Sequence, residues 1–422
     1  MRALTTAIAI ALIFLFAFSA LAETEVKVNG QVRYRGEFSK KSFDPDAKFL
    51  EASYLRTRIN VEAVKDDNMH AFVQLQDSRM IGGTTSSGDP ASAGLNDGEN
   101  VDLHQAYVQL DRIWINGLGS KVGRFELNLG NQRVFGAVGW HNVGRSWEGG
   151  ISWIDQPSFR VDMFSLKRLE LNDDNGNRDF NVWGAQLALK ELGFEVFGFY
   201  ENDANETFEW IDNDTARQVG TQIDALQRAS VGIHGKRVSG QADVEINGVY
   251  QFGKMRPGDS QSETDIQAFL ATAEIGYAFN PDKKGRIAAG IDFASGDSDP
   301  NDDKYKAYQN LYYTGHKFRG YMDYFLGSGS DGLMDLMARF RYSPYDKWLV
   351  NLDVHHFSTA QEMNAEGDKG LGLEFDLGVT TTSVKGVKMV YGASLFLPSE
   401  AYAGMADKEA GFWGYSMLIA NF

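Results

Sequence analysis

Polar and apolar residues alternate over short segments that recur along almost the whole of this chain. In 241–252, the residues Gln241, Asp243, Glu245 and Asn247 share one face of an extended segment, and apolar residues occupy the other face. A soluble sandwich also alternates, but it buries its apolar face. Here the polar face carries more charge than a protein core accepts. The pattern therefore predicts an all-β protein, a transmembrane β-barrel with an apolar outside and a charged inside.

The alternation divides the chain into about 18 strands, an even number as expected when both chain ends lie on the same side of a membrane. Strands are predicted near residues 25–38, 49–65, 68–81, 99–111, 119–129, 145–154, 158–169, 178–190, 193–202, 227–236, 240–254, 264–279, 285–295, 331–343, 347–359, 369–381, 387–399 and 410–422.

The lengths of the connectors support this assignment independently. Short turns are predicted at 66–67, 155–157, 191–192, 238–239, 280–284 and 343–346, and long loops at 39–48, 82–98, 130–144, 203–226 and 296–330. Short and long connectors alternate, as periplasmic turns and extracellular loops do in outer-membrane barrels. We therefore expect one antiparallel barrel and no second domain.

The first 22 residues differ from the rest of the chain. Met1-Arg2 precedes an almost wholly apolar run, and Ser19-Ala20-Leu21-Ala22 ends in an A-x-A cleavage pattern. These features are typical of a signal peptide. We expect residues 1–22 to be removed on export and residues 23–422 to form the barrel.

Composition narrows the partners and the chemistry. The chain has no Cys, which excludes disulfides and thiolate metal sites. A net charge of -16 argues against nucleic acid as a partner. The aromatic-rich last segment, 412–422, ends in Phe422, an ending common in barrels that the assembly machinery of the bacterial outer membrane reads. We expect a monomer surrounded by outer-membrane lipid and lipopolysaccharide.

Three segments resemble the alginate export family of outer-membrane porins. They are the G-R-x-E-x-x-x-G-x-Q-R and W-x-N-x-G-R-S motifs within 122–149, the H-K-F-x-G-x-M-D motif in 316–323, and D-x-H-x-F in 353–357. The resemblance covers nearly the whole chain after the leader. It implies a monomeric barrel of 18 strands whose Arg-rich lumen passes an acidic polyuronate.

The alternation also predicts which charges face the lumen. A guanidinium can hold a carboxylate through two parallel hydrogen bonds, so arginines on polar faces are candidates for a selectivity wall. The candidates are Arg33, Arg35, Arg56, Arg58, Arg124, Arg339, Arg341 and His355 on strands, with Arg133 in the motif-bearing loop 130–144 and Arg145 directly after it. The same arginines would serve equally well to brace the wall against lumenal acids. Those acids are Asp243, Glu245, Glu274, Asp292, Glu374 and Asp376. Because they lie on other strands than most of the arginines, we expect one side of the lumen to be basic and the other side to be acidic.

The expected function is a channel through which hydrophilic, anionic saccharides such as uronate oligomers or polymers diffuse, without a cofactor. A general porin for small solutes is the alternative. The loops 130–144, 203–226 and 296–330 are candidates to plug or gate the lumen. The acidic stretch 297–303 starts like a calcium loop but has Asp302 and Tyr308 where that loop requires Gly and Glu. No nucleophile motif is found, so neither an enzyme nor a metal site is expected, and an adhesive surface protein remains a minor alternative.

Overall fold

The computed structural model of this chain describes residues 24–81, 101–170, 172–173, 176–177, 179–204, 223–257, 263–280, 282, 284–299, 301–310 and 312–422. The predicted signal peptide, the loop 82–98 and most of the loop 203–226 lie outside these residues, so they stay predictions.

Within the described residues, 18 long strands form the wall. They are β1 (Thr24–Lys40), β2 (Leu50–Lys65), β3 (Met69–Met80), β4 (Asp102–Leu110), β5 (Leu118–Phe125), β6 (Trp147–Asp155), β7 (Phe159–Leu169), β10 (Phe180–Leu189), β11 (Phe194–Asp203), β12 (Ile223–Ser239), β13 (Ala242–Pro257), β14 (Thr264–Asn280), β15 (Gly285–Ala294), β17 (Leu333–Tyr342), β18 (Trp348–Ser358), β19 (Gly370–Thr381), β20 (Val387–Pro398) and β21 (Gly411–Asn421). The short elements are β8 (Asn172–Asp173), β9 (Gly176–Asn177), β16 (Lys304–Tyr305), a 3-10 turn (Gly315–Lys317) and α2 (Glu400–Ala403).

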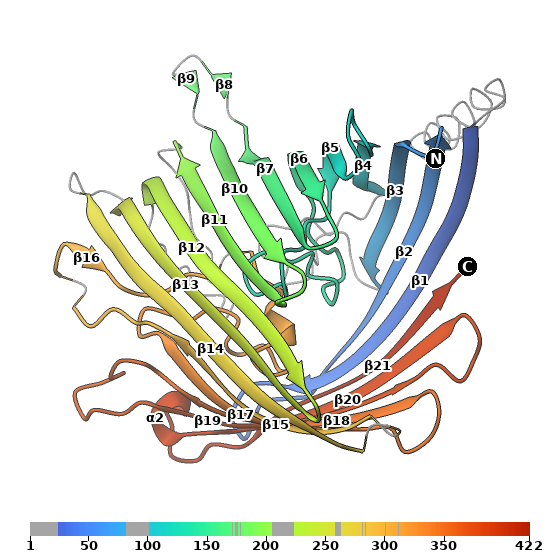
Figure 1. The fold of residues 1–422 in the computed structure, drawn as a ribbon. Coiled ribbons are helices and arrows are strands. Elements are labelled where there is room, and N and C mark those ends of the chain that lie inside the picture. Colours follow the sequence, from blue (N-terminus) through green and yellow to red (C-terminus); the bar gives the residue numbers. More distant parts are fainter. Residues whose placement is uncertain are drawn as a thin grey trace.

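The wall closes on itself, which confirms the predicted fold class (Figure 1). Each long strand pairs antiparallel with the next, and β1 pairs with β21 from Gln31 opposite Asn421 to Lys40 opposite Phe412. A closed barrel leaves no unpaired strand edge, so the backbone N–H and C=O groups of the wall are satisfied.

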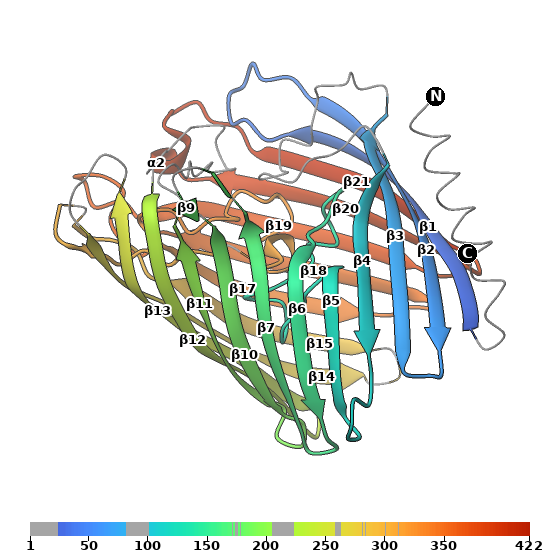
Figure 2. The same cartoon turned by 90° about the horizontal axis from the view of Figure 1, so that it is seen from above.

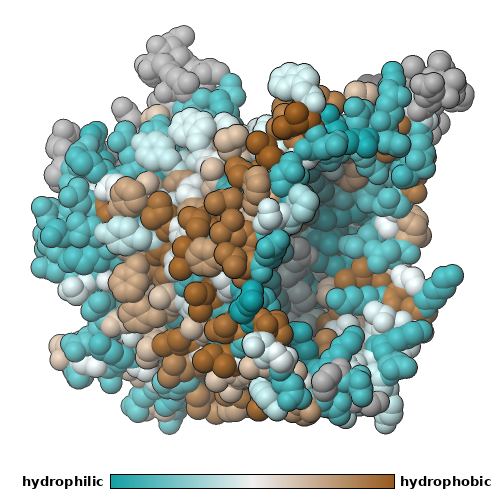
Figure 3. Space-filling model, viewed as in Figure 1, coloured by the Kyte–Doolittle hydropathy of each residue, from teal (hydrophilic) through white to brown (hydrophobic). Residues whose placement is uncertain are grey.

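Side chains on the two faces of the wall divide as the alternation predicts. Apolar side chains such as Tyr34, Val122 and Ile246 stand exposed on the outer face. Figure 3 shows a broad brown, hydrophobic area on the outer wall, beside a teal-lined hollow. No helix among the described residues is long and apolar enough to cross a membrane.

Short turns gather at one end of the barrel and long loops at the other (Figure 2). We call these the turn end and the loop end. One predicted turn is misplaced by two residues. β12 runs through Ser239, and the chain reverses at Gly240-Gln241, where Gly240 adopts a φ of 61° that favours glycine.

Two long loops fold into the lumen, as Figure 1 shows in teal and orange. The first inner loop is residues 126–146, and the second inner loop is residues 312–332. They meet through backbone bonds, from Gly136 N to Tyr312 O at 2.8 Å and from Thr314 N to Gln132 O at 3.1 Å. β5 therefore ends at Phe125, earlier than predicted, because the chain leaves the wall there.

Apolar side chains fix each inner loop to the wall. Phe135 of the first inner loop is fully buried against Trp147 and Phe164. Met322 and Phe325 of the second inner loop pack in a separate cluster with residues of β18 and β20. An 18-stranded barrel is too wide for wall side chains to fill alone, and the two loops occupy that interior.

Candidate functional site

Four arginines project from neighbouring strands toward the first inner loop. Arg33 and Arg35 lie on β1, Arg56 and Arg58 lie on β2, and Arg33 is the direct cross-strand partner of Arg56. We call this group the arginine cradle. Like charges in such pairs repel each other unless other groups compensate them.

Backbone carbonyls of the first inner loop provide that compensation. Arg33 donates to the oxygens of Gly139 (2.8 Å), Trp140 (3.0 Å) and His141 (3.0 Å). Arg35 donates to Trp140 O at 2.6 Å, and Arg56 to His141 O at 3.2 Å. Arg33, Arg35 and Arg56 are buried, so these charges hold a loop rather than face open water.

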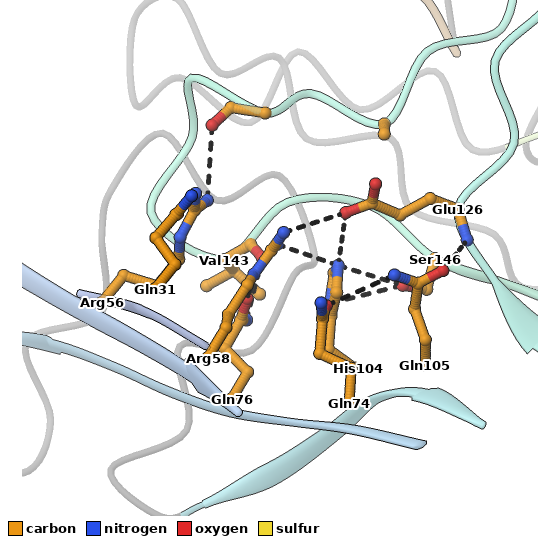
Figure 4. A network of polar contacts seen from close by, with 12 residues as sticks. Gln31, Arg56, Arg58, Gln74, Gln76, His104, Gln105, Glu126, Val143 and Ser146 are labelled. Atoms are coloured by element: carbon orange, nitrogen blue, oxygen red, sulfur yellow. Dashed lines mark hydrogen bonds and ion pairs between the residues drawn. The ribbon is translucent and has the colours of Figure 1, made fainter. Parts of the chain in front are cut away.

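Arg58 joins the cradle to the start of the same loop. Its guanidinium donates to Gln76 Oε1 at 2.6 Å, Glu126 Oε1 at 3.2 Å and Val143 O at 3.2 Å. Figure 4 shows Arg58 and His104 both directed at Glu126. Burial alone would raise the pKa of Glu126, but the hydrogen bond from His104 and the charge of Arg58 outweigh it, so this pKa lies below its ordinary value.

Carboxylates on β19, which β20 and β21 separate from β1 in the wall, hold the second inner loop in a complementary way. On β19, Glu374 accepts the backbone N–H of Met322 at 2.8 Å, and Asp376 accepts that of Tyr321 at 3.1 Å. The basic side therefore binds backbone oxygens and the acidic side binds backbone nitrogens. On β18, His355 is buried and its Nδ1 lies 2.7 Å from Asp335 Oδ2, which leaves it no access to a solute.

Arg133 and Arg145 connect the two inner loops to each other and to the wall. Arg133 and Arg319 both bond the buried Asp292 of β15. Burial lowers the pKa of Arg133 to about 9, so it keeps its charge at neutral pH. Arg145 donates to Gly136 O and Tyr313 O, each at 3.4 Å.

The structure corrects the predicted place of Arg124. Its neighbour Phe125 is buried with Phe135 inside the lumen, and Val122 is exposed on the outer face. Since side chains alternate along a strand, Arg124 points outward, where it pairs with Glu148 at 2.7 Å. The polarity of Arg124 suggested a position in the lumen. Arg124 is the second-last residue of β5, just before the chain leaves the wall for the first inner loop.

The other predicted wall cations, Arg339 and Arg341, lie on β17, which β18 to β21 separate from β1. Arg339 is 3.2 Å from Glu274 and 3.8 Å from Asp353, so carboxylates balance it. Arg341 is exposed and donates to Asn351 Oδ1 at 3.2 Å. Lys317, which the sequence reasoning missed, is exposed on the second inner loop and donates to Asn131 O at 2.9 Å. Its only signal was its place in the H-K-F motif.

The stretch 297–303 bonds mainly to itself. Asp297, Asp299 and Asp302 each accept a backbone N–H two residues further on, and Asp302 also pairs with Lys306. Within the described part of the chain, no group of three or more His, Cys, Asp or Glu is placed to hold a metal ion.

Solved structures with this architecture come from outer-membrane porins. Pseudomonas aeruginosa OpdK, crystallised with vanillate, is 10% identical over 94% of this chain and 98% of its own, with a TM-score of 0.58. Acinetobacter baumannii OccAB1 is 12% identical, covering 94% and 96%, with a TM-score of 0.61. A BenF-like porin from Pseudomonas fluorescens Pf-5 is 9% identical, covering 94% and 98%, with a TM-score of 0.59. At these identities, the likeness shows the fold.

The sequence itself matches a family model. No curated protein matches the chain, but the model described as alginate export matches residues 24–415. This range covers every strand of the wall from β1 into β21. The predicted resemblance and the bacterial outer membrane as location are thereby confirmed. This chain is an outer-membrane β-barrel that belongs to the alginate export family.

Proposed function

We propose that this protein is a monomeric, non-enzymatic channel through which anionic saccharides, such as uronate oligomers, diffuse across the outer membrane. Its family and its porin-like barrel support a channel. The finer assignment rests on the charges that remain open to a solute once the inner loops are in place. Buried arginines in the cradle do not enter that balance.

Arg341 and Lys317 carry this proposal. Both are exposed, and the hydrogen-bond acceptor of each is a neutral oxygen, of Asn351 and Asn131. Arg339 differs because Glu274 and Asp353 offset its charge. Arg341 and Lys317 thus leave positive charge for a passing carboxylate, which a guanidinium or an ammonium binds through charge-assisted hydrogen bonds.

The general porin is the second candidate, and the same wall supports it. Arg286 pairs with both Asp243 and Glu274, so much of the lumenal charge is internally neutral. A lumen balanced in this way would pass small solutes of either sign. The two candidates therefore differ in the ion selectivity that they predict.

Reversal potentials across a KCl gradient in a planar bilayer test the proposal. We expect the wild-type channel to prefer anions and uronate oligomers to block its current. Arg341→Gln combined with Lys317→Gln should move the reversal potential toward cation preference, because charged side chains that line a channel set its ion selectivity.

Lys385→Gln is the matched control, since Lys385 lies exposed in the turn between β19 and β20, outside the lumen. Its reversal potential should equal that of the wild type. A wild-type channel that prefers cations and is not blocked by uronate would contradict the proposal and favour the general porin.

A further inference from the structure

A band of side-chain amides covers the inner wall on the turn-end side of the arginine cradle. Five adjacent strands, from β21 through β1 to β4, supply its members. They are Asn421, Gln31, Asn29, Asn60, Gln74 and Gln105. We call this group the amide band.

Hydrogen bonds orient the amide band in one direction. Gln105 donates to Gln74 at 3.3 Å, Gln74 to Asn60 at 2.7 Å, and Asn60 to Asn29 at 2.6 Å. Each of these pairs is also a direct cross-strand pair in the barrel register. An amide nitrogen carries two hydrogens, so each donor keeps one N–H after its bond within the band.

The band borders a pocket of about 440 Å³. Its lining includes Asn29, Gln31, Asn60, Gln74 and Asn421, with Arg58 at the side of the cradle. Its volume lies within the range of small-molecule sites. Gly30 and Phe422 complete the lining, and the Phe422 backbone oxygen accepts the N–H of Gly30 at 2.8 Å.

We infer that this pocket binds the hydroxyl groups of one saccharide ring on its way through the channel. Hydroxyls and amides each donate and accept hydrogen bonds, so a row of pre-oriented amides matches adjacent ring hydroxyls. Arg58 is already bonded to Gln76 and Glu126, so the pocket recognises hydroxyls rather than a carboxylate. This inference rests on the proposed function and adds where the sugar binds.

Current block by glucose and by glucuronate, each titrated at low and at high KCl, tests this site. Both sugars should block the wild-type channel, and block by glucose should change little with salt, because uncharged hydrogen bonds are not screened. Asn60→Leu with Gln74→Met removes two amides at similar volume. At the usual strength of a hydrogen bond, the half-blocking concentration of both sugars should rise about tenfold.

Two further variants keep the result interpretable. Asn247→Leu removes a lumenal amide that bonds Thr272 on the far wall, and it should leave block unchanged. Asn29→Leu alters an exposed member of the band and should weaken block without disturbing the fold. An unchanged KCl conductance reports that each barrel is intact.

If glucose and glucuronate block the wild type and both band variants at equal concentrations, the inference that this pocket binds a saccharide is wrong, whatever the ion selectivity of the channel. Block by glucuronate alone, abolished at high salt, would also overturn it, because the site would then recognise charge. Absence of anion preference together with amide-dependent block would contradict the proposed function and leave the pocket standing.

Discussion

Buried charges in this barrel bond to specific partners, and the pair formed by Arg228 and Glu201 joins two neighbouring strands inside the wall. Arg228 of β12 donates to Glu201 of β11 at 2.6 and 2.8 Å, and the two side chains are 2% and 0% exposed. Tyr312 of the second inner loop donates to the same carboxylate at 2.7 Å. Burial and the Glu201 charge raise the pKa of Tyr312, so its hydroxyl stays a donor.

Arg228→Met should therefore destabilise the barrel strongly. Removing one partner leaves a buried charge without compensation, which costs about 3–5 kcal/mol. Denaturant unfolding in lipid, followed by tryptophan fluorescence, measures this loss. Arg256→Met is the control, because Arg256 is half-exposed and 3.7 Å from Glu263, and an exposed ion pair contributes about 0–1 kcal/mol. Equal unfolding midpoints for the two variants would refute the expectation.

The period-two alternation predicts which face of the wall a side chain occupies better than it predicts which groups that side chain contacts. It placed Arg33, Arg56 and Arg339 on the inner face, where the structure has them. It failed at Arg124 because a polar residue at a strand end is as stable outside as inside. It could not show that backbone carbonyls of residues 139–141 bond the cradle, because those contacts come from a loop distant in sequence.

At the scale of elements, the arginine cradle helps to fix the conformation of the first inner loop, because residues 139–143 form no secondary structure of their own. The carbonyl oxygens of 139–141 and 143 accept hydrogen bonds from arginines of β1 and β2. Charge-assisted hydrogen bonds are stronger than neutral ones. The cradle therefore holds the backbone of residues 139–143 in the lumen, in addition to the apolar packing of Phe135.

Arg33→Gln with Arg56→Gln should loosen this loop. Its carbonyls lose their charged donors, so the loop should leave the lumen part of the time and the single-channel conductance should rise and fluctuate. Arg341→Gln is the control for fluctuation, since Arg341 also faces the lumen but bonds Asn351 of the neighbouring strand and not an inner loop. A double variant with the steady conductance of the wild type would show that apolar packing around Phe135 suffices to hold the loop.

At the scale of the whole molecule, the wall was predictable and the filling of the lumen was not. Strand number and closure follow from period-two alternation and from the parity of short and long connectors. The loops 130–144 and 296–330 were candidates to enter the lumen because of their length and motifs. Their contact with each other, through Gly136 and Tyr312, depends on the diameter of the barrel and is not encoded in any local pattern.

The contact between the two inner loops is relevant to how solutes pass, because a path between the loops would require them to separate. Phe135 and Tyr312 of the two inner loops stack in one buried apolar cluster, and each loop has its own charged anchor on the wall. Two loops that are each fixed to the wall and are bonded to each other are expected to stay together. We therefore expect solutes to pass beside the joined loops, along the amide band and the wall that carries Arg341.

A disulfide between the loops tests this expectation. Thr314 bonds Gln132 through both backbone and side chain, at 3.1 and 2.9 Å, so Gln132→Cys with Thr314→Cys places two thiols within bonding reach. The chain has no other Cys to interfere. If solutes pass beside the loops, conductance and sugar block should be the same when the pair is oxidised and when it is reduced. A conductance that falls on oxidation and recovers on reduction would mean that the loops must separate for transport, and the path would then run between them.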